Sequence, residues 1–207
     1  MQLEYLPPSL AGWAEIAATP TDFDAYPPVP KLRVKWPLGE ANVDRTAVAA
    51  SLIFAPWIAG RCDHIRQFSA LTEQRLVEWF QGERIWVAPT PVRVGGLPIP
   101  RGTRRILLGE PDSSTQGTHL RLQSVSPLVG SGKDREVTRI ASNLAAFLRN
   151  SPTPEARYCM EVGFAVLVAE SLSANEIIHP EFGLRSPAAF SAAARLLESV
   201  SLGLRRD

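Results

Sequence analysis

Three side chains with potential chemistry lie side by side in the sequence, at Cys62, Asp63 and His64. In an extended segment Cys62 and His64 share one side, so they could form a metal pair or a thiolate with its general base. Adjacent residues seldom converge on one point, and a surface loop ahead of a helix is the structural alternative. The cluster supports one hypothesis, an enzyme with Cys62 and His64 as its catalytic candidates.

A glycine-flanked loop, which we call the anion loop, is the second candidate site. It is formed by Gly130, Ser131, Gly132 and Lys133. It departs from a P-loop, because Pro127 stands where the first glycine belongs and Asp134 where the magnesium-binding Ser or Thr belongs. A loop leading from a strand into a helix would still present backbone N–H groups and the Lys133 charge to an anion. In the enzyme hypothesis it binds a small anionic metabolite. The alternative is a flexible connection in which Asp134 caps the helix.

The third candidate site is a basic stretch, 84–109, which contains five arginines and no acidic residue. Its prolines favour edge strands or a projecting ribbon, because a central strand cannot lose those hydrogen-bond donors. Such a ribbon could grip an RNA or DNA backbone, with Trp86 available for base stacking. The arginines concerned are Arg93, Arg101, Arg104 and Arg105. The alternative is a solvated hairpin that packs against the acidic N-terminal segment.

Metal-binding and nucleotide-binding motifs are absent from the sequence. The three histidines, His64, His119 and His179, show no i, i+4 spacing, and HExxH does not occur. GxGxxG and GxSxG are absent as well. We therefore expect neither a metal nor a cofactor.

The net charge of +1 hides an uneven distribution along the 207 residues. Residues 1–44 carry −3, residues 45–150 carry +6 and residues 151–207 carry −2. The basic middle suits a polyanionic partner. With 45% hydrophobic and 21% charged residues, the composition is that of a folded globular protein and argues against a disordered chain.

Membrane and secreted classes are also unexpected. The apolar stretch 47–60 is shorter than the roughly 20 residues of a membrane span, and Pro56 interrupts it. The two cysteines form no CxxC, which argues against a zinc ribbon and against a disulfide framework. No basic region precedes an apolar run at the N-terminus, so no secretory signal is indicated. We expect a cytoplasmic protein without a membrane partner.

The expected fold class is α+β, with a small, mainly antiparallel sheet and a C-terminal helical layer. Seven of the eighteen prolines lie within residues 1–44, among many large apolar side chains. This predicts an extended N-terminal arm that packs against the body of the chain or another subunit. Residues 45–207 are expected to form a single α+β domain, β-rich over 83–130 and helical over 134–203.

Alternating or periodic apolar residues locate several elements within this scheme. Apolar and basic residues alternate over 32–36, which is typical of a half-buried strand. Segment 47–58 is expected in the core, as a short helix or strand. Helices are predicted from four start signals, at Ser69, Asp134, Thr153-Pro154 and Ser186-Pro187. The apolar run 158–172 would also suit a buried strand, and the start signal at Thr153 favours a helix.

The segment from Leu120 to Gly132 combines a strand with Ser-Pro-Leu and a glycine-containing loop. It resembles the corresponding segment of RAMP-type subunits of CRISPR effector complexes, over about 13 of the 207 residues. The resemblance implies a ferredoxin-like fold that binds guide RNA.

These observations lead to one main functional hypothesis and two alternatives. The main hypothesis is a non-catalytic subunit of a larger assembly, which contacts RNA or DNA through the basic ribbon and other protein subunits through the N-terminal arm. The first alternative is the small-molecule enzyme with Cys62 and His64. The second is a purely architectural assembly protein.

Overall fold

The structure, a computed structural model, describes residues 1–35, 41–81, 84–88, 99, 102–108, 119–125, 132–133, 137–179, 184 and 186–206. Its first three strands are β1 (Gln2–Leu6), β2 (Trp13–Thr19) and β3 (Lys31–Lys35), which pair antiparallel in chain order. Alternate side chains along each strand, such as Leu3, Ile16 and Leu32, are buried. The extended arm expected for residues 1–44 is not confirmed, because these strands belong to the sheet. The prolines between them lie in the connecting turns.

Most of the remaining strands pair in parallel. They are β4 (Arg61–His64), β5 (Trp86–Val87), β6 (Arg104–Leu107), β7 (His119–Val125), β8 (Gly132–Lys133), β9 (Val137–Ser142), β10 (Ala174–His179) and β11 (Gly203–Arg206). The expectation of a mainly antiparallel sheet is wrong, since six of the ten described pairings are parallel.

Two of the parallel pairings follow from helices inserted between strands. Helix α2 (Ala70–Phe80) connects β4 to β5, and α5 (Pro187–Glu198) connects β10 to β11. A helical crossover returns the chain to the same end of the sheet, so the next strand runs in the same direction. Sequence periodicity located these helices, but it carries no signal for which strands they join.

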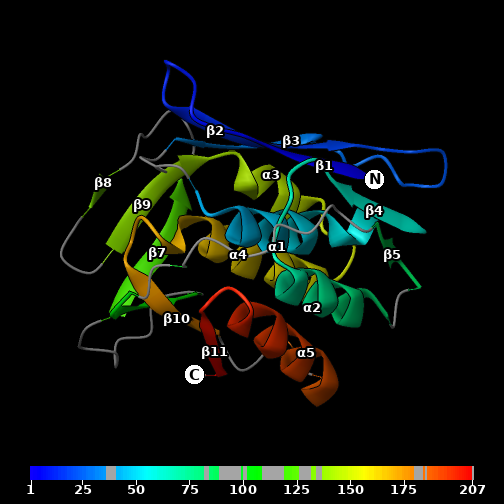
Figure 1. Ribbon diagram of the computed structural model, residues 1–207. Helices are drawn as coiled ribbons and strands as arrows, with labels where there is room; N and C mark the ends of the chain where they lie inside the picture. The colour runs from blue at the N-terminus through cyan, green and yellow to red at the C-terminus, as the bar shows by residue number, and fades with distance from the viewer. Residues whose placement is uncertain are drawn as a thin grey trace.

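Within the described part of the chain the sheet has eleven strands, in the order β11-β10-β6-β7-β9-β3-β2-β1-β4-β5, with β8 paired to β9. It curls around a central pair of helices, α1 (Val43–Phe54) and α4 (Pro154–Ala169), as Figure 1 shows. Helices α2 and α5 lie on the side of this pair away from β1–β3. The mixed α and β content expected from the sequence is therefore confirmed.

A short antiparallel seam joins the two halves of the sheet. Strands β3 and β9 pair only at Val34 with Ser142 and at Lys35 with Ala141, among the residues described. Asn143 extends this contact, because its side-chain oxygen accepts from the Arg33 amide (2.7 Å) and its side-chain nitrogen donates to the Lys31 carbonyl (2.9 Å). These partners are 110 and 112 residues apart in sequence.

Three of the predicted helix starts are confirmed by side-chain caps. Ser69 accepts a hydrogen bond from the Thr72 amide, Thr153 from Ala156 and Ser186 from Ala189. The run 158–172 is helical through Ala169, and segment 47–58 contributes to α1 and to a 3₁₀ turn, η1 (Ala55–Trp57).

Helices α1 and α4 approach closely at Gly163. A Cβ atom there would lie 2.9 Å from the Ala49 carbonyl oxygen and 2.9 Å from Cγ1 of Ile53. Real Cβ atoms do not approach a backbone oxygen so closely, so the absence of a side chain at Gly163 lets the two helices pack at this distance.

The prediction of a helix that starts at Asp134 is wrong over its first half. Residues Val137–Ser142 form β9, and only α3 (Leu144–Arg149) is helical. The β-branched side chains of Val137, Thr138 and Ile140 favour a strand, and β9 pairs with β7 on one side and with β3 and β8 on the other. The C-terminal helical layer is not confirmed, because strands alternate with helices over 137–206. The division of the chain at residue 44 stays a prediction.

Charged residues are buried where α1 begins. Asn42 caps α1, Asp44 accepts a hydrogen bond from the Ser69 amide (2.8 Å), and Arg45 donates through Nε to the Val200 carbonyl (3.3 Å). Burial lowers the pKa of Arg45, and the nearby Glu170 carboxylate opposes this shift. These groups tie the start of α1 to α2 and α5.

None of the helices in the described ranges has the length and apolar composition that a bilayer crossing requires.

Candidate functional site

Strand β4 brings Cys62 and His64 together, as its two-residue period predicts. The Cys62 sulfur lies 3.6 Å from Nε2 of His64, and the Ser51 hydroxyl of α1 lies 3.1 Å from the same nitrogen. The Phe68 ring meets the imidazole edge to face, with 5.1 Å between ring centroids. The side chains that could react are thus in contact with one another.

The same surroundings keep both groups uncharged. Burial raises the pKa of the Cys62 thiol to about 12, and burial lowers the pKa of His64 to about 4. The Cys62 side chain is fully buried. A nucleophilic cysteine needs a thiolate and access for its substrate, and this arrangement provides neither.

Asp63 points away from this pair. Its carboxylate accepts from Nε of Arg61 at 2.8 Å, and the Arg61 guanidinium lies over the Trp86 ring, 4.8 Å from its centroid. Successive residues of a strand face opposite sides, so the cluster divides into a buried Cys62 beside a partly buried His64, and an Arg61–Asp63 ion pair at the surface. Among the described residues, no group of three histidine, cysteine, aspartate or glutamate side chains could hold a metal ion.

The structure describes only some of the residues that were predicted to contact nucleic acid or an anion. Arg104 and Arg105 are exposed on β6, where Nε of Arg105 lies 2.9 Å from the Glu176 carboxylate. Four residues, Arg93, Arg101, Gly130 and Ser131, lie outside the described residues. Gly132 and Lys133 form β8 and pair with Arg139 and Thr138 of β9. The sequence predicts that the anion loop leads into a helix N-terminus. The next described element is β9 instead, so the described residues show no helix whose dipole would support that site.

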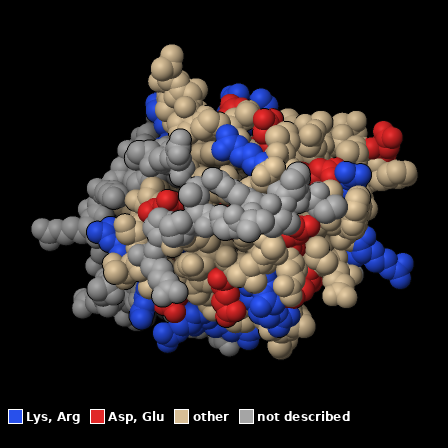
Figure 2. Space-filling model, in the orientation of Figure 1, with Lys and Arg blue, Asp and Glu red and all other residues tan. Residues whose placement is uncertain are grey.

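A basic surface not predicted as a site lies on β3 and β9. Lys31, Arg33 and Lys35 are exposed on one face of β3, and Arg139 is exposed on β9, two residues before the Lys35 partner Ala141. We call these four residues the β3–β9 basic surface. Figure 2 shows lysine and arginine side chains along the upper edge of the molecule, where Figure 1 places β2 and β3.

Among the described residues, an acidic side chain of β2 pairs with part of this surface. Glu15 of β2 pairs with both Lys31 (3.3 Å) and Arg33 (2.9 Å). The Lys35 ammonium lies 5.8 Å from the centroid of the Trp13 ring. Exposed pairs of this kind contribute at most about 1 kcal/mol and are screened by salt, so a phosphate can compete for these cations.

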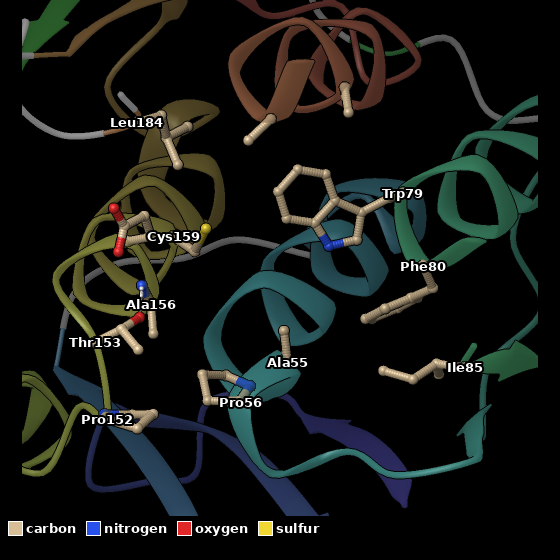
Figure 3. Close-up of a pocket in the computed structure, with 13 residues that line it drawn as sticks. Ala55, Pro56, Trp79, Phe80, Ile85, Pro152, Thr153, Ala156, Cys159 and Leu184 are labelled. Carbon is tan, nitrogen blue, oxygen red and sulfur yellow. Dashed lines mark hydrogen bonds between the residues drawn. The ribbon is translucent and has the colours of Figure 1, made fainter. Parts of the chain in front are cut away.

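A cavity of about 380 Å³ lies among the helices. Its floor and walls are mostly apolar: Ala55, Pro56, Trp79, Phe80, Ile85, Ala156, Cys159, Leu184, Ala189 and Ala192. Three exposed residues at the start of α4, Pro152, Thr153 and Glu155, complete its lining. Figure 3 shows the Trp79 ring and the Cys159 side chain on opposite sides of the cavity.

Comparison with protein-family models, with curated proteins and with solved structures finds no match for this chain.

One of these sites had a partial signal in the sequence. The alternation of apolar and basic residues over 32–36 predicts a strand, and the described strand is Lys31–Lys35. The shared face of its three cations is not part of that prediction. The cavity had no such signal. Its lining comes from α2, α4, α5 and η1, so only the packing of these elements creates it.

Proposed function

We propose that the protein is a non-catalytic subunit of a larger assembly that contacts the phosphate backbone of RNA or DNA. The observation that carries the proposal is the β3–β9 basic surface, in which three cations project from one strand. Phosphate contacts require exposed lysine and arginine side chains on a shared face and no particular sequence readout. The contact residues are Lys31, Arg33, Lys35 and Arg139, with Arg104 and Arg105 on the neighbouring part of the sheet.

Exposed aromatic side chains support the subunit part of the proposal. Phe23 and Tyr26 are 84% and 83% exposed in the loop between β2 and β3. The loop is held in place by Asp24, which accepts from the Ala59 and Thr21 amides (both 2.8 Å). Large aromatic groups presented on an anchored loop are typical of protein interfaces. In this proposal the loop takes the partner-binding role that the N-terminal arm was expected to have.

The test is filter binding of labelled single-stranded RNA and DNA over a range of salt concentrations. A Lys31→Gln/Arg33→Gln/Lys35→Gln variant is compared with Arg149→Gln/Arg157→Gln/Arg195→Gln, which removes the same charge from exposed helix positions. The strand variant should bind at least 10-fold more weakly at low salt. Its plot of log binding constant against log salt should be flatter by about 2, because each single-strand phosphate contact contributes roughly 0.7.

Three outcomes would overturn the proposal: no binding by the native protein, equal losses in the two variants, or binding that salt does not weaken. Native mass and the ultraviolet absorbance ratio of the purified protein test the assembly separately. A multi-subunit species free of nucleic acid would favour the purely architectural alternative.

A further inference from the structure

The helical cavity is large enough to hold an organic molecule. Small-molecule sites usually enclose about 300 to 1,000 Å³, and a cavity of about 150 Å³ accommodates benzene. At about 380 Å³, the cavity has room for roughly fifteen non-hydrogen atoms by the same ratio. Four alanines in its lining, Ala55, Ala156, Ala189 and Ala192, leave this space open. A fused bicyclic ring system with a short substituent fits that volume.

The charge of the lining selects the polar group of such a molecule. Of the thirteen described lining residues, Glu155 is the one that carries a charge, and it is exposed to solvent. The Trp79 indole forms part of the wall, and indole is the best aromatic partner for a cation. A carboxylate and an indole in one lining favour an ammonium group on the ligand.

The start of α4 offers little to an anion. Pro154 has no N–H group, and the Ala156 amide already donates to the Thr153 hydroxyl (3.1 Å). The usual attraction of a helix N-terminus for negative charge is therefore weakened where it meets the cavity. An acidic ligand would also face the Glu155 carboxylate.

We propose that this cavity binds a hydrophobic amine, with its apolar body against Trp79, Phe80 and Cys159 and its ammonium group at Glu155. The site is independent of the β3–β9 basic surface, because none of its lining residues belongs to β3 or β9.

Calorimetric titration with three probes of equal shape tests the assignment: 1-naphthylmethylamine, 1-naphthalenemethanol and 1-naphthoate. The amine should bind at least 10-fold more tightly than naphthoate. Glu155→Gln should weaken the amine about 5-fold or more and leave the alcohol unchanged. Glu73→Gln, which removes a carboxylate from the first turn of α2, serves as the matched control and should change neither.

A filling substitution tests the location. Ala192→Phe places a ring in the cavity and should reduce amine binding at least 10-fold, whereas Ala188→Phe, at an exposed position of the same helix outside the lining, should not. In the wild-type protein, saturating amine should slow the reaction of Cys159 with N-ethylmaleimide at least 5-fold. This measurement does not depend on the folding of any variant.

Equal affinity for all three probes, or a preference for naphthoate, would overturn the assignment of an ammonium group. Absence of amine binding, or binding that neither Ala192→Phe nor Cys159 labelling detects, would overturn the site. A cavity that accepts an apolar side chain of a partner protein would show no preference for the amine, and that result also counts against the proposal.

Discussion

The two cysteines lie near successive parts of α1, in surroundings that differ in the space around the sulfur. Cys62 is enclosed beside Ser51 and His64, whereas Cys159 lines the cavity that begins at Ala55. The surroundings of Cys62 contain several reactive residue types, but a substrate has no access to the sulfur. Cys159 is also buried, but it borders a cavity from which a small reagent could approach its sulfur. Residue identity thus marks a candidate, but packing decides whether a ligand can reach it.

Helix α4 shows the same contrast within one turn. At Gly163 it touches α1 so closely that no side chain fits, and at Cys159, four residues earlier, its side chain meets an open cavity. The two positions are about 6 Å apart along the helix axis, since each residue rises 1.5 Å. We call the surroundings of Cys62 and Gly163 the sealed region and those of Cys159 the open region, and their difference can be tested.

The largest expected difference is in thiol reactivity. At pH 8, Cys159 should react with N-ethylmaleimide at least 100-fold faster than Cys62. Cys62 is fully buried, and with a pKa of about 12 its thiolate fraction at that pH is about 10⁻⁴. Peptide mass spectrometry of a labelling time course measures both rates in the wild-type protein. Similar rates would show that the Cys62 cluster opens readily, and the contrast would fail.

The sealed region should also give a pH dependence of stability. His64 has a folded pKa of about 4 against about 6.5 when unfolded, so the unfolded chain binds more protons between these values. The contribution of His64 to the free energy of unfolding is fully present above pH 6.5. The free energy of unfolding should fall by up to about 3 kcal/mol as the pH drops to 4.

Urea unfolding at several pH values measures this dependence. His64→Gln should have a flatter profile than the wild-type protein between pH 6.5 and 4. Parallel profiles would mean that the imidazole is solvated in the folded state.

Added volume should have opposite effects in the two regions. Gly163→Ala should destabilise the protein by about 2 kcal/mol despite the better helix propensity of alanine, because the new methyl group meets the Ala49 carbonyl. Ala192→Leu adds three carbons at the cavity and should stay within about 0.5 kcal/mol of the wild-type stability, or exceed it. Thermal and urea unfolding compare the pair. A neutral Gly163→Ala would contradict the close packing of α1 and α4.

The smallest effect is expected for Ser51→Ala, which removes the hydroxyl next to Nε2 of His64. The free energy of unfolding should fall by about 1 kcal/mol, the usual net contribution of one hydrogen bond. In a double-mutant cycle with His64→Gln the two losses should not add, because both remove the same contact. Additive losses would place the Ser51 hydroxyl outside this network.

Local sequence signals predicted local structure well. Ser69, Thr153 and Ser186 marked helix starts because a capping hydroxyl and the following residues are adjacent in sequence. The alternation over 32–36 predicts a strand for the same reason, and the strand is Lys31–Lys35. Even the contact between Cys62 and His64 followed from the two-residue period of an extended chain.

Long-range packing was not predictable in this way. The apolar pattern from Val137 to Leu148 fits one helical face, yet its first half is a strand because β7 and β3 supply hydrogen-bond partners. The burial that removes the reactivity of Cys62 comes from side chains on other elements. The cavity likewise depends on where α2 and α5 pack, and no local pattern in either helix encodes that position.

The seam between β3 and β9 has a consequence for how the chain reaches this structure. Asn143 and the paired residues of β9 close a loop of more than a hundred residues onto β3. Closing so long a loop carries a large entropic cost before its contacts form, so contacts of this kind slow folding. The β3–β9 basic surface spans this seam and is complete only once it has closed. A nascent or partly folded chain would therefore lack the complete surface, and the nucleic-acid binding that we propose for it would reach full strength only with the native topology.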